Sequence, residues 1–204
     1  MRRSMPQIAR EALERGYANF QPLSNGPTVA DVWIEARIGL VLLVHRRDDG
    51  LVAEELYHSI RDDNGQWSEC DHLNGSIVGI DIESPGAVTQ ALAGSLMEIV
   101  SESTSLVFTG CEMEEETEEE DCEEKEESFT PLRTLSVLVG DRVDFIELEN
   151  LVHGSSPAFV SRFREVRSPL ALIVLLPGQC VRVSPTRRDG ASTSRLAPAW
   201  ELAN

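Results

Sequence analysis

The chain has 204 residues, enough for one large domain or two small ones with a core that needs neither disulfide nor metal. Apolar residues make up 41% and charged residues 26%, which excludes collagen-like, wholly disordered and disulfide-scaffold proteins. The formal net charge of −17 argues against attraction to nucleic acid or anionic membranes. Lys125 is the only lysine, so Schiff-base, phosphate-loop and kinase-type sites are nearly excluded.

The N-terminal segment, residues 1–20, carries the signs of a short helix. Ser4 and Gln7 have the spacing of a capping box, in which each side chain bonds the other residue's backbone N–H. Ile8, Ala12 and Leu13 lie on one side of the helix that would follow, to about residue 17. Because the apolar side is narrow, we expect this helix to pack against the rest of the protein.

Residues 21–110 form the first strand-rich part. The run 38–44, inside an expected strand at 33–45, is apolar on both faces, as in a central strand. Asn64-Gly65 is a strong signal for a tight hairpin turn, and Asn74-Gly75 offers a second turn. The pattern predicts an antiparallel meander with its further strands at residues 51–61, 66–73 and 77–82.

A second helix is expected at residues 86–100. Ser84 suits the N-cap, Pro85 suits the first helical position, and apolar residues follow at helical spacing from Val88 to Ile99. A short strand is expected at residues 105–109.

Residues 129–190 form the second strand-rich part, where Gly, Pro and Asp separate short apolar segments. Residues 191–204 are expected to form a flexible tail, although Trp200 and Leu202 could hold its end. The predicted fold is a mainly β, antiparallel sandwich-like domain with an N-terminal and a mid-chain helix, interrupted by a disordered acidic loop. Strands of the second part are expected at residues 132–139, 142–148, 158–166, 170–176 and 180–184.

The acidic low-complexity loop, residues 111–128, is the most unusual segment. From Glu112 to Glu127 it holds twelve carboxylates and one lysine, a net charge of −11, which leaves −6 for the rest of the chain. Like charges repel and almost nothing there is apolar, so we expect this acidic run to be extended and disordered.

Four interpretations of the acidic run remain open at this point. It could be a solvated spacer, a docking element for a basic protein partner, a mimic of a nucleic-acid backbone, or a loose binder of divalent cations. Mimicry requires an ordered acidic face, which the composition argues against. The run lacks the ligand spacing and central glycine of a calcium loop, so any cation binding would be weak.

The candidate catalytic residues cluster around the Asn64-Gly65 turn. Pairing through that turn sets His58 opposite Asp71, where the carboxylate could orient the imidazole and raise its pKa for use as a base. Cys70 and His72 share the other face, so a cysteine–histidine pair is conceivable. The alternative is an ordinary strand that carries a hydrogen-bonded histidine, and we favour this alternative.

Metal and cofactor sites are not predicted. Cys70 and His72 are only two of the four ligands that a closed zinc site needs, and cofactor-binding glycine motifs are absent from the sequence. The turn at residues 48–50 places His45 opposite residue 52, 53 or 54, too far from His58 to share a metal. Arg162 and Arg164 share a strand face and could grip phosphate, carboxylate or the acidic run, but solvent-facing charges on an edge strand are the favoured interpretation.

The compartment follows from what the sequence lacks. Residues 1–17 have no apolar signal-peptide core, and the apolar runs are far shorter than the roughly 20 residues that span a membrane. We therefore expect a cytoplasmic protein with reduced thiols, and the arginine-rich composition is typical of high-GC bacteria.

Taken together, the sequence favours a non-enzymatic interaction or accessory protein, with docking of a basic partner by the acidic run as one option. The alternative is a hydrolase or metal-dependent enzyme that uses His58, Asp71, His72 and Cys70. No cofactor, nucleic acid or membrane is predicted as a partner.

Overall fold

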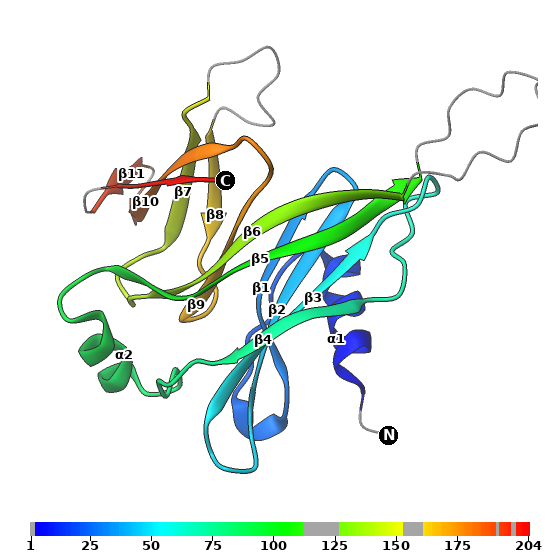
Figure 1. The fold of residues 1–204 in the computed structure, drawn as a ribbon. Helices are drawn as coiled ribbons and strands as arrows, with labels where there is room; N and C mark the ends of the chain where they lie inside the picture. Colours follow the sequence, from blue (N-terminus) through cyan, green and yellow to red (C-terminus); the bar gives the residue numbers. More distant parts are fainter. Residues whose placement is uncertain (1–2, 112–126, 153–160, 191, 197–198) are drawn as a thin grey trace, which may run out of the picture.

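A computed structural model describes residues 3–111, 127–152, 161–190, 192–196 and 199–204 (Figure 1). The protein is mainly β with antiparallel sheets and two α-helices in this part, which confirms the predicted fold class. The helices are α1 (Met5–Arg15) and α2 (Pro85–Leu92), with a 3-10 turn at Leu23–Asn25. The strands are β1 (Thr28–Glu35), β2 (Ile38–Arg46), β3 (Val52–Ile60), β4 (Asp71–Ile77), β5 (Met97–Cys111), β6 (Glu127–Val139), β7 (Phe145–Asn150), β8 (Ser161–Glu165), β9 (Leu170–Leu175), β10 (Cys180–Asp189), β11 (Ser192–Arg195) and β12 (Trp200–Ala203).

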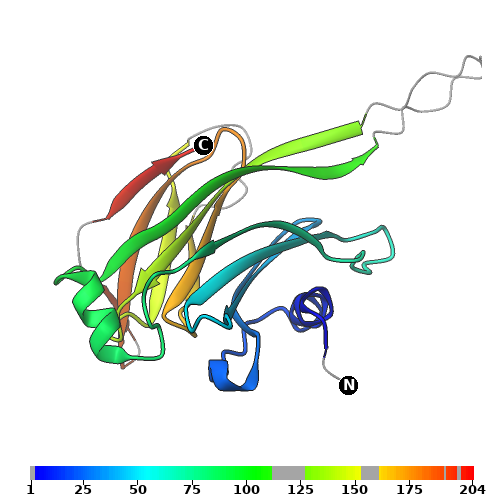
Figure 2. The same cartoon turned by 60° about the horizontal axis from the view of Figure 1, so that its bottom comes forward.

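The strands form three sheets that pack as successive layers. The first sheet has the order β1-β2-β3-β4, the second β5-β6-β9, and the third β11-β10-β7-β8, with β12 also paired to β10. Figure 2 shows α1 on the outer side of the first sheet, with the long strands β5 and β6 crossing its other side. The second sheet is therefore buried on both faces over much of its length.

The N-terminal helix forms where the capping-box spacing predicts it. Gln7 Oε1 accepts a hydrogen bond from the Ser4 backbone N–H at 3.0 Å, and the helix ends at Gly16 in the left-handed region, with φ of 77°. Ala12 and Leu13 are buried against the first sheet, as their position on one side of the helix predicts.

The two apolar runs of the sequence are strands with both faces buried. In β2, Leu42 faces the core between the first and second sheets, while Leu43 faces the core under α1. In β9, Leu172 belongs to the first of these cores and Ile173 to the core between the second and third sheets. Because both faces of β2 and β9 are buried, their sequences are continuously apolar and do not alternate with polar residues.

The predicted strand at 33–45 spans the end of β1, a tight turn and most of β2. β1 ends at Glu35, β2 begins at Ile38, and Ala36 takes a positive φ of 49° in the tight turn between them. The apolar run belongs to β2 alone, so the prediction of a central strand holds for residues 38–44 but not for those before them.

The prediction of a turn at Asn74-Gly75 is wrong, because both residues lie inside β4. Gly75 faces Glu55 across the β3–β4 ladder, and a Cβ at position 75 would clash with the Glu55 carboxylate. Glycine here makes room for a neighbouring side chain instead of turning the chain. In place of the two strands expected at 66–73 and 77–82, the chain forms the single strand β4, which overlaps the end of the first and the start of the second.

The second helix is shorter than predicted. α2 begins at Pro85 after the Ser84 cap, but Ala93 and Gly94 take positive φ angles of 48° and 92° and end it. From Met97 onward the chain is β5, which is far longer than the expected strand at 105–109. The apolar residues within 96–100 are compatible with either a helix or a strand. The pairing of β5 with β6 makes this segment a strand from Met97 onward.

The C-terminal stretch contains β11 and β12 where a flexible tail was expected. β10 continues to Asp189, β11 folds back on it, and β12 pairs with its first half, which buries Leu202 in the core between the second and third sheets. In the same part of the chain β7 starts only at Phe145, because residues 140–144 form the turn after β6.

An ion pair ties the three sheets together. Asp31 in β1 accepts a hydrogen bond from Arg164 Nη2 in β8 at 2.8 Å and from the Leu172 backbone N–H in β9 at 2.7 Å. Arg164 also donates to the backbone carbonyls of Leu172 and Val32. The Asp31–Arg164 pair thus occupies backbone groups on the edge of β9 that does not face β6.

The two strand-rich parts meet in the second sheet, where β5 pairs with β6 from Met97 opposite Val139 to Cys111 opposite Glu127. Residues 111, 127 and 128 of the predicted acidic loop lie in these strands, and its residues 112–126 lie outside the described residues. None of the helices in the described part is long and apolar enough to cross a membrane.

Candidate functional site

The register of the β3–β4 hairpin is the one that the sequence predicts up to Tyr57, where a β-bulge shifts it by one residue. His58 lies opposite Asp71, and Tyr57 lies opposite His72. His58 occupies the face of β3 that carries Leu56, and its Nδ1 is buried without a hydrogen-bond partner among the described residues. Burial lowers the pKa of the His58 imidazole more than the Asp71 carboxylate raises it. The expected rise in pKa is therefore wrong in direction.

Cys70 is enclosed between α1 and the first sheet. Its residue surface is 4% exposed, and burial raises the pKa of the Cys70 thiol to about 11. A thiolate is the nucleophilic form of cysteine, so this environment suppresses the reactivity that a catalytic cysteine needs. Among the described contacts, none joins Cys70 to His72.

His72 instead contacts a carboxylate that the sequence analysis did not single out. Its Nε2 lies 2.6 Å from Glu55 Oε2, while His45 Nε2 lies 3.3 Å from Glu55 Oε1. The three residues come from β4, β3 and β2. The signal was available in the sequence, because the turn at residues 48–50 places His45 opposite Ala53, diagonally beside Glu55.

In the His45–Glu55–His72 cluster, each imidazole contacts a different oxygen of the Glu55 carboxylate. Among the described residues, no group of three or more His, Cys, Asp or Glu could hold a metal ion. Described surface depressions of about 350 Å³ beside α2 and about 420 Å³ beside Trp200 are lined by residues outside the β3–β4 hairpin. The structure therefore brings His58 and Asp71 together but surrounds them with little else that is reactive.

The arginines of β8 already have acidic partners. Arg164 bonds Asp31, and its side chain is only 15% exposed, so it does not face solvent as expected for an edge strand. Arg162 lies 3.6 Å from Glu35, although β8 is indeed at the edge of its sheet. This engagement disfavours the hypothesis that the two side chains grip a phosphate or the acidic run.

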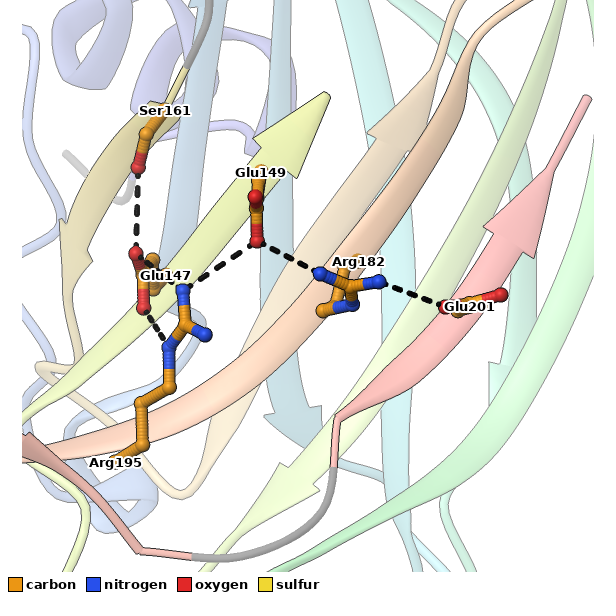
Figure 3. A network of polar contacts seen from close by, with 6 residues as sticks. All are labelled: Glu147, Glu149, Ser161, Arg182, Arg195 and Glu201. Atoms are coloured by element: carbon orange, nitrogen blue, oxygen red, sulfur yellow. Dashed lines mark hydrogen bonds and ion pairs between the residues drawn. The ribbon is translucent and has the colours of Figure 1, made fainter. Parts of the chain in front are cut away.

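A second set of ion pairs covers the outer face of the third sheet (Figure 3). Arg195 bonds Glu147 at 2.7 Å and Glu149 at 3.4 Å, and Arg182 bonds Glu149 at 3.2 Å and Glu201 at 3.1 Å. Hydrogen bonds from Arg195 lower the pKa of the Glu147 carboxyl, despite the opposing effect of burial. Charges on this face largely neutralise one another.

The β5–β6 hairpin carries exposed apolar side chains that lie together on one face. Leu106 lies opposite Pro131, and Phe129 lies two residues before Pro131 in β6, so the three side chains share one face. Leu106 is 66% exposed and Phe129 is 49% exposed, and Pro131 is exposed as well. The three residues form the hairpin patch, which lies next to the strand ends that flank the acidic run.

Comparison of the chain with models of known protein families, with curated proteins and with solved structures finds no match.

Proposed function

We propose that the protein is a non-enzymatic interaction module that binds a basic protein partner through its acidic run. The observation that carries this proposal is the pairing of β5 and β6 up to Cys111 and Glu127. The run is then the connection of a hairpin with both ends held, and 11 of the 17 net negative charges are concentrated there.

Charge of this density suits recognition of a basic surface. Opposite charges accelerate encounter and set which partners associate, particularly at low ionic strength. The acidic residues on the outer face of the third sheet are paired with Arg182 and Arg195, so they compete little for such a partner. The β3–β4 hairpin supports an enzymatic role less well, because burial raises the pKa of its cysteine to about 11.

The proposal is tested by affinity capture from native extract with identification by mass spectrometry. The baits are the intact protein, a variant in which residues 112–126 are a Gly/Ser loop of equal length, and a variant with Asp in place of each Glu there. A basic partner is expected with the intact and aspartate baits and should fall roughly tenfold or more with the neutral loop. Equal recovery of the same partners by all three baits would contradict a role for the acidic run.

A further inference from the structure

The exposure of Leu106 in the hairpin patch is not explained by folding. Leu106 is more exposed than any other large apolar residue in the described part of the chain. The preceding outward residues of β5, Glu102 and Thr104, are polar and exposed, as expected for a face in contact with water. An apolar side chain at position 106 stabilises the folded chain little, because its burial is so incomplete.

The opposite face of the same strands is fully used. Val107 and Leu132 are each 0% exposed in the core between the first and second sheets. Alternation along β5 and β6 therefore places one row of side chains in the core and the hairpin patch on the outside. The register that places Val107 and Leu132 in the core also places the hairpin patch on the outer face.

Cover by the third sheet ends at the edge of the patch. Arg133 donates to the carbonyl of Ala203 at the end of β12, and Asn204 donates to the carbonyls of Pro131 and Leu175. β9 likewise pairs with β6 only from Arg133 to Leu138. Beyond this line β5 and β6 continue as a two-stranded ribbon whose inner face still covers the first sheet, and the end of this ribbon projects past the neighbouring strands in Figures 1 and 2.

The charge beside the patch decides what can cover it. A second copy of this chain would bring two runs of net charge −11 together, and an anionic membrane would be repelled in the same way. A basic protein segment satisfies both features, since its Lys and Arg residues match the run while an apolar side chain covers Leu106 and Phe129.

We infer that the hairpin patch is the docking surface for a protein segment in which basic residues flank an apolar anchor. This inference rests on the proposed function and adds the chemistry of the partner to it. The acidic run speeds and orients encounter, and the anchor slows dissociation by burying the apolar face of β5 and β6.

Two synthetic peptides test the inference by fluorescence anisotropy. Both carry the same number of lysines, but one has Leu and Trp at its centre where the other has Ser. Wild-type protein is expected to bind the Leu/Trp peptide roughly tenfold more tightly than the Ser peptide. The Leu106→Ser/Phe129→Ser variant should bind the two peptides equally, while both affinities still fall with added salt.

The matched control is Leu51→Ser/Phe163→Ser, which removes the same two residue types elsewhere on the surface, where they are 45% and 50% exposed. This variant should keep the tenfold preference, and thermal unfolding checks that both variants are folded. Equal binding of the two peptides by the wild type overturns the docking surface and leaves the proposed function standing. If the control variant loses the preference for the Leu/Trp peptide to the same extent, the docking surface is also overturned. If neither peptide binds the wild-type protein, the proposed function is overturned as well.

Discussion

Single residues of the β3–β4 hairpin differ in chemistry because their surroundings differ. Asp71 is exposed at the start of β4, His58 is half-buried on the face of the first sheet that is turned away from α1, and Cys70 is enclosed by α1. Burial lowers the pKa of His58 and raises that of Cys70, so both groups are held in their neutral forms near pH 7. A neutral imidazole can still act as a base, but no described contact joins His58 or His72 to Cys70, and the raised pKa of Cys70 disfavours the nucleophilic thiolate.

The state of Cys70 can be measured by its rate of alkylation with iodoacetamide at pH 8, with each cysteine followed by peptide mass spectrometry. An ordinary thiol has a pKa near 8.5. With a pKa of about 11, Cys70 has far less thiolate, and we expect it to react roughly 100-fold or more slowly in the folded than in the urea-unfolded protein. Half-buried Cys180 serves as the internal reference. If Cys70 reacted as fast as Cys180 in the folded protein, the cysteine–histidine hypothesis would return.

Among the elements, α1 packs so closely on the first sheet that one strand position must be glycine. A Cβ at Gly39 in β2 would lie 2.6 Å from Leu13 Cδ2 and 2.8 Å from the ring of Trp67. No positive φ is involved, so this requirement comes from the approach of α1 and not from the backbone.

Gly39→Ala is therefore expected to lower the free energy of unfolding by about 1–3 kcal/mol, the usual effect of overpacking a core. Gly86→Ala in α2 is the matched control, because its nearest neighbour would be 4.0 Å from the new Cβ. A helical alanine there should raise the free energy of unfolding by about 0.5–1 kcal/mol. Urea denaturation measures both, and a neutral Gly39→Ala would show that α1 can shift away from β2.

At the scale of the whole molecule, the Asp31–Arg164 pair connects the three sheets through β1, β8 and β9. Both side chains are about 15% exposed, and burial raises the pKa of Asp31 although Arg164 and the Leu172 N–H oppose this. Loss of one partner leaves the other charge buried without compensation, which is more damaging than loss of both.

Arg164→Met is expected to lower the free energy of unfolding by about 3–5 kcal/mol, and Asp31→Asn combined with it by less. Without Arg164 the pKa of Asp31 in the folded state rises further above its unfolded value. The folded state then binds a proton more tightly than the unfolded state, so the variant loses stability as pH rises through this window. Denaturation at pH 5 and pH 8 should show the greater deficit at pH 8.

The control for this prediction is Arg10→Met, which removes the exposed pair with Glu14 on α1. An exposed helical pair contributes only about 0.3–0.5 kcal/mol. If Arg164→Met lowered the free energy of unfolding by no more than Arg10→Met, a structural role for the Asp31–Arg164 pair would be contradicted.

The hairpin patch shows why the candidate site could be predicted only in part. The acidic run is visible in the sequence, and so is the strand-like pattern on either side of it. Apolar residues in a strand are normally assigned to a core, as Val107 and Leu132 are. Leu106 and Phe129 are exposed only because β9 and β12 stop short of them, and the ends of strands remote in sequence are not encoded in their local pattern.

Local spacing and periodicity were enough to determine the mainly β class, the start of α1, the burial of both faces in β2, and the pairing of His58 with Asp71. These features depend on residues close together in the chain. The tertiary structure alone decided that Asn74-Gly75 continues a strand, that the chain after Gly94 pairs as β5, and that Arg164 bonds Asp31. Each of these outcomes is set by a partner far away in sequence, whose contact outweighs a local preference worth only about 1 kcal/mol.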